Sequence, residues 1–386
     1  MRFIPRDLSV SAPGLAPPRA IVLFGPRRVG KATLLRELTR RESVRWYDGD
    51  NLADADALQL YSSGDVMAVL AEARTIVIDE AQQVPNIALT LKRLVDANET
   101  LGKPVRIFAT CSSSLDLAKG VRESAVGRLV KRELWPLSVS ELAGRKGWGW
   151  VRENLGRLMV YGTYPIAVAQ PEIAREFLRV WCDGVLFKDI LTLPGIRRGR
   201  RFDALVRLLA KSVGSEVSYE ALSRETGLNK ATVADYIKLL EQCFIVRVCP
   251  SYSKSLPNEL KKGKKIYFCD TGIRNAVIGD FSPISSRPDA EAIWENFFYM
   301  ERVKLHSALR DFTNVFFWRT TGARQASLDF VEVRDGAMQA FDCSLDPKGG
   351  ARPDDAFRAA YPDCGIVVAT PADLQKIFGN ARQGPP

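Results

Sequence analysis

The feature that most constrains this fold is a glycine-rich loop between an apolar run and a helical pattern. Residues 20–24 read Ala-Ile-Val-Leu-Phe, which is apolar on both faces and predicts a buried parallel strand. The loop that follows reads Gly25-Pro26-Arg27-Arg28-Val29-Gly30-Lys31, and helical spacing of apolar residues begins after it. Strand, G-x-x-x-x-G-K and helix in this order predict a phosphate-binding loop.

The chemistry explains why these residue types occur together. Glycines let backbone N–H groups turn inward around phosphates, and the following helix N-terminus adds positive potential. Lys31 would reach the β- and γ-phosphates. Ala32 stands where a serine or threonine normally binds Mg²⁺, and Thr33 is rotated by about 100° on a helix, so it does not substitute. We therefore expect ATP or ADP at residues 25–33, with weakened Mg²⁺ binding and slow hydrolysis; the alternative is a glycine turn with a chance lysine.

Two further apolar runs end in polar side chains. The first ends at Asp79 and Glu80, which predicts that Asp79 holds Mg²⁺ and that Glu80 polarises the attacking water; an acidic strand end without this role is the alternative. The second runs over 105–110, and ligands bind at the carboxyl ends of strands in open α/β sheets. Thr110 or Ser112 is therefore a candidate sensor of the γ-phosphate, with a plain loop of small residues as the alternative.

Arg128, which follows Gly127, is the candidate transition-state arginine. It would act either in its own subunit or from a neighbouring subunit of a homo-oligomer. A plain surface arginine is the alternative.

Five motifs, in this order, resemble a known family: GPRRVGK, IVIDEAQQVP, ATCSSS, AVGR and ELWPLSVSEL. They resemble the prokaryotic AAA-family ATP-binding proteins in which an uncharacterised C-terminal domain follows the ATPase. The resemblance covers about residues 18–345 and implies an α/β P-loop core of the AAA type. Ala32 replaces a usual threonine of that family, which puts hydrolysis in doubt, and Cys111 replaces a usual glycine.

The middle of the chain predicts a helical lid behind the nucleotide. Residues 151–193 repeat apolar side chains at helical spacing around a break at Tyr161–Pro165. A basic linker, 197–201, follows, and it is either a solvated charge run or a contact to a phosphate backbone.

Residues 202–247 predict a winged helix-turn-helix. In its third helix, Val233, Ile237 and Leu240 recur at i, i+4 and i+7 and would face the core. Such modules place the third helix in the major groove of DNA.

Double-stranded DNA is therefore a candidate partner through residues 230–265. Five lysines near the wing would contact phosphates: Lys254, Lys261, Lys262, Lys264 and Lys265. Asp235 and Glu241 on the third helix oppose phosphate, so a structural or protein-docking module is the alternative.

The C-terminal part predicts a helix over 290–310, a strand over 314–321 and a hairpin that turns at Asp335-Gly336. This order resembles the restriction-endonuclease-like domain of the same family, in which acidic side chains bind Mg²⁺ and a lysine positions water. The matching acids are Glu295, Asp329 and Asp342.

The nuclease signature is incomplete because Ser344 stands at the lysine position. Lys348 keeps the strand parity, but Pro347 interrupts that strand. We expect a vestigial nuclease fold used for packing or DNA docking.

Composition excludes several other classes. The single histidine among 386 residues, His306, excludes two-histidine metal sites and is expected on a solvated helix face. No apolar run approaches the ~20 residues that a bilayer requires, and the first residues lack a signal-peptide core. The seven cysteines include no C-x-x-C pair, which favours reduced thiols in a cytosolic protein.

The sequence therefore predicts an α/β protein in four parts: a P-loop AAA-type core (1–145), a helical lid with linker (146–200), a winged helix (201–282) and a degenerate restriction-endonuclease-like domain (283–386). The leading hypothesis is a cytoplasmic ATPase whose nucleotide state is coupled to its C-terminal half. Two alternatives are a non-hydrolysing, nucleotide-dependent DNA-binding switch and an ATP-regulated, Mg²⁺-dependent nuclease.

Overall fold

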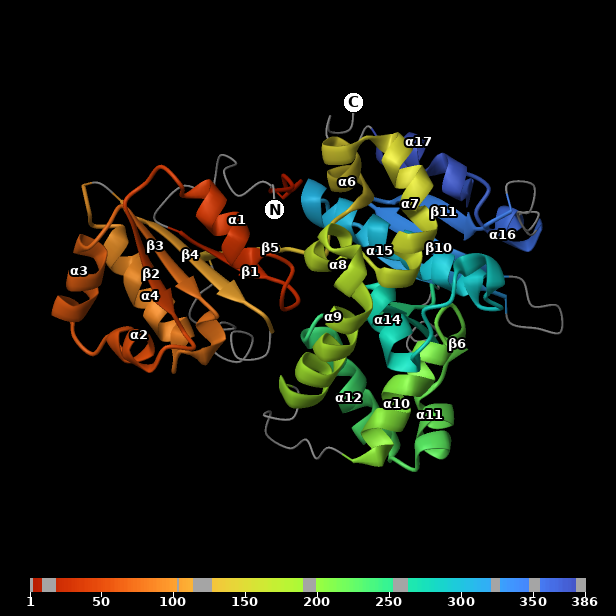
Figure 1. The fold of residues 1–386 in the computed structure, drawn as a ribbon, viewed down its shortest axis with the longest axis horizontal. Helices are drawn as coiled ribbons and strands as arrows, with labels where there is room; N and C mark the ends of the chain where they lie inside the picture. The colour runs from red at the N-terminus through yellow and green to blue at the C-terminus, as the bar shows by residue number, and fades with distance from the viewer. Residues whose placement is uncertain are drawn as a thin grey trace. The chain divides into compact units, whose positions relative to one another are not determined.

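The computed structural model describes residues 3–8, 19–102, 104–113, 127–189, 199–252, 263–320, 327–346 and 355–379. The chain forms two compact units (Figure 1). The first unit comprises Leu8–Trp135 with Gln242–Phe244, and the second unit comprises Met1–Asp7, Pro136–Glu241 and Ile245–Pro386. Within the described residues, no helix is long and apolar enough to cross a membrane.

The first unit is a five-stranded parallel sheet with helices around it, in the strand order β2-β3-β4-β1-β5 (Figure 1). Its elements are β1 (Ala20–Phe24), α1 (Lys31–Leu38), β2 (Val44–Asp48), α2 (Leu52–Ala57), α3 (Ser63–Ala71), β3 (Thr75–Asp79), η1 (Ala81–Gln83), α4 (Ile87–Asn98), β4 (Arg106–Cys111) and β5 (Leu129–Glu133). The predicted α/β fold with a parallel sheet is confirmed.

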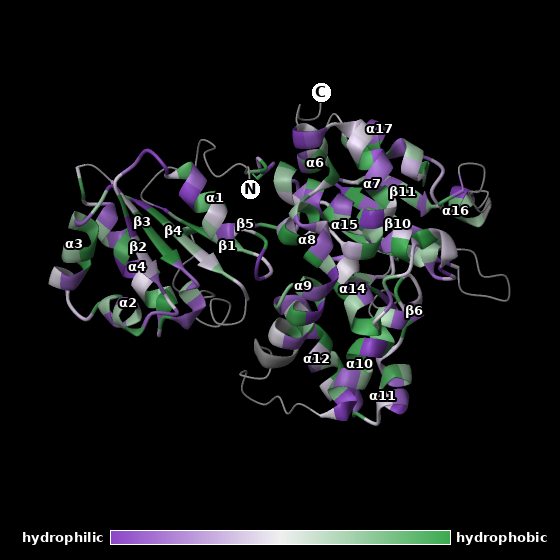
Figure 2. Cartoon of the chain, viewed as in Figure 1, coloured by the Kyte–Doolittle hydropathy of each residue, from purple (hydrophilic) through white to green (hydrophobic). Residues whose placement is uncertain are grey.

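The three central strands are the ones that the sequence predicts. All five residues of β1 are buried, and the core of the sheet is hydrophobic along β3 and β4 (Figure 2). The edge strands β2 and β5 read VRWYD and LVKRE, and their charged residues interrupt the continuous apolar run that marks the central strands. An edge strand has one neighbour and keeps one side open to water, so it does not need a continuous apolar run. Because β4 lies between β1 and β3, the ends of these three strands are adjacent.

The second unit contains the remaining elements: α6 (Val139–Lys146), α7 (Trp148–Tyr161), α8 (Pro165–Ala169), η2 (Pro171–Ile173), α9 (Ala174–Trp181), η3 (Cys182–Asp189), α10 (Arg200–Lys211), β6 (Glu216–Val217), α11 (Tyr219–Thr226), α12 (Lys230–Gln242), β7 (Val246–Pro250), β8 (Lys264–Phe268), α14 (Thr271–Ile278), η5 (Ile284–Ser286), α15 (Ala290–Leu309), β9 (Asn314–Arg319), β10 (Ser327–Arg334), β11 (Ala337–Cys343), α16 (Asp355–Ala360), β12 (Gly365–Ala369), η6 (Pro371–Asp373) and α17 (Leu374–Phe378).

The helices predicted as a lid pack within the second unit. Asn275 on α14 donates from Nδ2 to the carbonyl oxygen of Val160 at 2.8 Å. The Thr163 amide donates to Oδ2 of Asp270, which caps α14, at 2.8 Å. Residues on α7 and α14 are therefore joined by buried hydrogen bonds, which are costly to break.

Helices α10, α11 and α12 are accompanied by a three-stranded antiparallel sheet in the order β6-β8-β7, whose strand β6 lies between α10 and α11 in the chain. Val233, Ile237 and Leu240 are buried, which confirms the predicted core face of α12. Lys230 and Lys238 are exposed on the same helix. The segment between β7 and β8, with Lys254, Lys261 and Lys262, lies outside the described residues.

The C-terminal part of the second unit is a four-stranded sheet in the order β12-β11-β10-β9. The predicted hairpin turn is present, because Asp335 and Gly336 both have positive φ, 50° and 81°. Side chains alternate across the sheet. Phe330 meets the rings of Phe298 and Tyr299 on α15.

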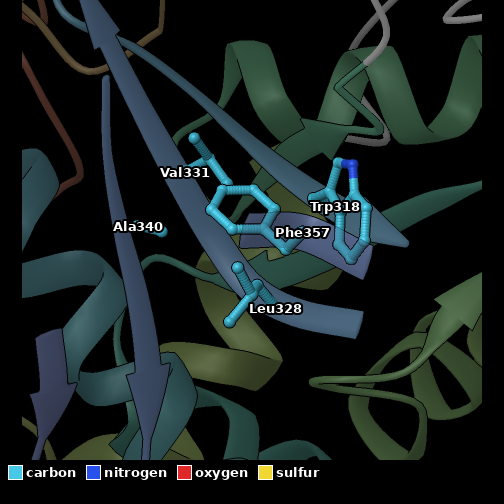
Figure 3. Packing of buried hydrophobic residues seen from close by; sticks show 5 residues of the cluster. All are labelled: Trp318, Leu328, Val331, Ala340 and Phe357. Carbon is cyan, nitrogen blue, oxygen red and sulfur yellow. The ribbon is translucent and has the colours of Figure 1, made fainter. Parts of the chain in front are cut away.

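Val331, the residue after Phe330, belongs to a separate hydrophobic cluster. Its members are Trp318, Leu328, Val331, Ala340 and Phe357 (Figure 3). Phe357 comes from α16, so this helix packs against the sheet as α15 does. Apolar layers on the two faces fix the strands that carry the acidic residues discussed below.

His306 does not lie on a solvated face, so that expectation was wrong. Its side chain is 12% exposed, and Nδ1 lies 2.8 Å from Oδ1 of Asp311. Nε2 lies 2.9 Å from Oε1 of Glu332 on β10. Burial opposes the charged ring, but the bond and charge of Glu332 outweigh burial and raise the pKa of His306. His306 is a structural link between α15 and β10.

Candidate nucleotide-binding site

The loop after β1 is shaped by two glycines. The Gly25 amide donates to the carbonyl oxygen of Cys111 at 3.2 Å, and an added Cβ would lie 2.0 Å from the carbonyl oxygen of Leu134. No side chain fits there. Gly30 has φ 94° immediately before α1, and Arg28 is also left-handed, with φ 69°. These positive φ values turn the loop so that it leads into the N-terminus of α1.

Lys31 is the first residue of α1 and is only 5% exposed. Its Nζ donates to the carbonyl oxygens of Gly25 at 2.9 Å and Pro26 at 3.1 Å. Burial lowers the pKa of Lys31, and the negative charges of Glu80 and Asp79 oppose that change. The loop therefore closes around a buried lysine whose ammonium bonds to the loop's own carbonyl groups.

Thr110 lies between the loop and the carboxylates because β4 lies between β1 and β3. Its hydroxyl donates to Oδ1 of Asp79 at 2.5 Å and accepts from the Glu80 amide at 3.0 Å. The side chain is fully buried. In this structure Thr110 orients the two acidic residues at the end of β3.

Glu80 has a left-handed backbone, φ 45°, which is uncommon for a residue with a side chain. Its Oε2 accepts from Nε2 of Gln82 at 2.5 Å and from Oγ of Ser112 at 2.7 Å. Burial alone would raise the pKa of Glu80, but Lys31 and these two donors outweigh burial and lower it. The carboxylate is ionised and held by two neutral donors.

Gln82 and Asp50 were missed in the sequence. Gln82 follows the acidic pair by two positions and also donates to Oγ of Ser112 at 2.9 Å. Asp50 follows β2, and burial, then the charge of Glu80, raises its pKa. Gln82 and Asp50 could have been found by searching for polar residues just after the carboxyl end of each predicted strand.

The two positions after Lys31 differ in exposure. Ala32 is half-buried, whereas Thr33 is exposed. The Thr33 hydroxyl lies on another face of α1, as helical geometry requires.

The structure places Arg128 at the edge of the sheet opposite to the glycine-rich loop. It precedes β5, and its carbonyl accepts from the amide of Ala20, the first residue of β1. Phe24, which leads into the loop, pairs with Glu133, five residues further along β5. At 3.3 Å per residue the two edges are about 16 Å apart. The Arg128 guanidinium instead bonds to Asp96 on α4.

The nuclease-like acids lie in the second unit and form no metal centre. Glu295 and Asp329 both contact the ammonium of Lys265, while Asp342 is buried on β11. Lys265 was predicted to contact phosphate, but it is buried between carboxylates. In the part of the chain that the structure describes, no group of three or more His, Cys, Asp or Glu could hold a metal ion. Lys348 lies outside that part.

Comparison with known families agrees with the geometry of the first unit. Residues 17–143 match the family model of an AAA domain. These residues form an AAA-type P-loop domain. Residues 152–283, all in the second unit except 242–244, match a domain of unknown function, DUF8612.

The curated relatives are themselves uncharacterised. The chain is 27% identical to Rv2008c of Mycobacterium tuberculosis over 329 residues, which cover 83% of this chain and 69% of that protein. It is 21% identical to MJ1544 of Methanocaldococcus jannaschii, over 65% of this chain and 60% of that protein.

Solved structures with weak likeness include ORC1 of Aeropyrum pernix in complex with DNA (15% identity, TM-score 0.33, 69% of this chain and 87% of that one). Another is AMPPCP-bound DnaA of Aquifex aeolicus (14% identity, TM-score 0.25, 57% of this chain and 81% of that one).

Proposed function

We propose that the first unit binds ATP with Mg²⁺ and hydrolyses it slowly. The observation that carries this proposal is the buried Lys31 ammonium inside the loop, at the same sheet edge as Asp79 and Glu80. A triphosphate offers this ammonium negatively charged acceptors in place of neutral carbonyl groups, and the attraction between opposite charges adds to the hydrogen bond. Backbone amides at the start of α1 would bind the remaining phosphate oxygens.

Each acidic residue has one role in this proposal. Asp79, oriented by Thr110, would hold Mg²⁺, which neutralises phosphate charge when bound. Glu80, held by Gln82 and Ser112, would orient a water molecule and accept its proton. Titration calorimetry with ADP and ATP, with and without Mg²⁺, alongside phosphate release, tests both steps. Absence of binding would refute the proposal.

Restoring a hydroxyl at position 32 should accelerate hydrolysis. We expect Ala32→Thr to raise Mg²⁺-dependent turnover about tenfold or more, because a lost metal ligand that costs about 1.4 kcal/mol in the transition state slows the reaction tenfold. Ala32→Val is the matched control, since it has the shape of threonine without the hydroxyl and should not accelerate turnover. An unchanged rate in Ala32→Thr would argue against our explanation of slow hydrolysis.

The proposed role of Arg128 is to act on the nucleotide site of a neighbouring subunit. If the chain forms a homo-oligomer, its guanidinium would serve the site of a neighbouring subunit. Its bond to Asp96 would then have to break.

We also propose that the second unit contacts double-stranded DNA, with the nucleotide state biasing this contact. The proposal is supported by the element order α10-β6-α11-α12-β7-β8, which is the one expected of a winged helix, and by Lys230 and Lys238, which are exposed on α12. The Glu241 carboxylate, which would repel phosphate, is held in place within the unit, because its Oε1 accepts a hydrogen bond from the Val248 amide at 3.0 Å.

Loss of both α12 lysines should weaken DNA binding and flatten its salt dependence. For Lys230→Ala/Lys238→Ala we expect the slope of log affinity against log salt to fall by about 2, since each phosphate contact contributes about 0.9. The control is Lys146→Ala/Lys376→Ala, which removes the same charge from exposed positions on α6 and α17. Fluorescence anisotropy with a labelled duplex provides the measurement. Equal slopes in the two double variants would exclude α12 as the contact.

A further inference from the structure

The buried cluster around Lys265 joins three elements of the second unit. Nζ of Lys265, on β8, lies 2.8 Å from Oε1 of Glu295 on α15 and 3.3 Å from Oδ1 of Asp329 on β10. Lys265 is 6% exposed and Glu295 is 8% exposed. Charges this deeply buried must be compensated locally, because water cannot solvate them.

The two carboxylates have further neighbours besides the ammonium. The hydroxyl of Tyr267 donates to Oε1 of Glu295 at 2.5 Å, and the Cys343 amide donates to Oδ2 of Asp329 at 2.7 Å. On the other side, an added Cβ at Gly214 would lie 2.7 Å from Oε2 of Glu295. These contacts hold both carboxylates beside the ammonium.

The charge state of Lys265 agrees with this geometry. Burial alone would lower the pKa of Lys265, but the charges of Glu295 and Asp329 outweigh it and raise the pKa. Burial raises the pKa of Glu295 to about 7, and Lys265 opposes that shift. Lys265 therefore stays charged at neutral pH.

We propose that the Lys265 ammonium is a built-in cation that occupies the position of a divalent metal between Glu295 and Asp329, so that the native cluster binds neither Mg²⁺ nor Mn²⁺. Carboxylates that converge from a helix and a strand are typical ligands of such ions. Here one positive charge is supplied by the chain, and the ammonium already bonds to Oε1 of Glu295 and Oδ1 of Asp329, two oxygens that a metal would need. The cluster then ties β8 to α15 and β10 and carries out no metal-dependent hydrolysis.

Removal of Lys265 should convert this cluster into a metal site. The melting measurements use the full chain with Asp79→Ala, which removes the proposed metal ligand of the first unit. In this background we expect Mn²⁺ to leave the melting temperature of the chain unchanged relative to EDTA. Lys265→Ala should lower it by about 6–20 °C, because a broken buried ion pair leaves carboxylates uncompensated. Mn²⁺ should then restore at least half of the loss.

A second variant keeps the test decisive if Lys265→Ala does not fold. Lys265→Met/Glu295→Gln/Asp329→Asn removes all three charges, so it should fold and show no response to Mn²⁺. The proposal is overturned if Mn²⁺ stabilises the chain that retains Lys265 and this response disappears in Asp329→Asn. It is also overturned if Lys265→Ala folds and Mn²⁺ does not stabilise it, or if the native chain cleaves plasmid DNA and Glu295→Gln abolishes cleavage.

Discussion

Glu80→Gln should lower ATP turnover by about 10²–10⁴-fold, because this factor is the usual contribution of a positioned general base to the rate. Nucleotide affinity should stay within about threefold of the native value. The glutamine carbonyl can still accept the hydrogen bonds of Gln82 and Ser112, so the local structure is kept. What is lost is the carboxylate that would take a proton from water.

The measurement is single-turnover phosphate release, which detects slow hydrolysis. It should be made in the native chain and in Ala32→Thr, whose faster rate leaves room to observe a loss. Asp50→Asn is the control, because Asp50 is a nearby carboxylate that our proposal does not use as a base. A Glu80→Gln chain that hydrolyses ATP at the native rate would refute the role of Glu80.

Lys31→Ala should weaken nucleotide binding by about 10²–10³-fold. A charged hydrogen bond contributes about 1.5–3 kcal/mol, and the loss of about 3–4 kcal/mol from two phosphate contacts corresponds to that factor. The variant also loses the bonds to Gly25 and Pro26, so circular dichroism must show that the fold is retained.

The matched control for this variant is Arg40→Ala. Arg40 lies just beyond α1 with 76% of its side chain exposed, so its loss removes the same charge without touching the loop. Equal affinities of Lys31→Ala and Arg40→Ala, measured by titration calorimetry, would exclude Lys31 as a phosphate ligand.

The loop and the carboxylates of the first unit could be predicted because their signals are local. Residues 20–24 are a continuous apolar run, and Gly25, Gly30 and Lys31 follow within seven positions. Asp79 and Glu80 end a second such run. Strand order and register are not local, which is why Arg128 could be assigned to the nucleotide site although it lies at the opposite edge of the sheet.

Burial of charged residues was the second failure of sequence reasoning. Lys265 belongs to a basic stretch, and this pattern predicts a solvated side chain. Its partners Glu295 and Asp329 are 30 and 64 positions away in the sequence, so the pattern does not show that the lysine is buried against them. His306 is likewise buried against Glu332 on another element. Whether such a charged residue is buried depends on partners that are distant in the sequence. The local charge pattern does not identify these partners.

The central claim is that backbone amides of residues 25–31 enclose the phosphates of a bound nucleotide. Hydrogen–deuterium exchange of the full chain, with and without ADP and Mg²⁺, tests it most directly. We predict strong protection of amides in residues 25–35, and no such protection in Lys31→Ala. Unchanged exchange in this segment of a chain saturated with nucleotide, or protection confined to the second unit, would contradict the claim.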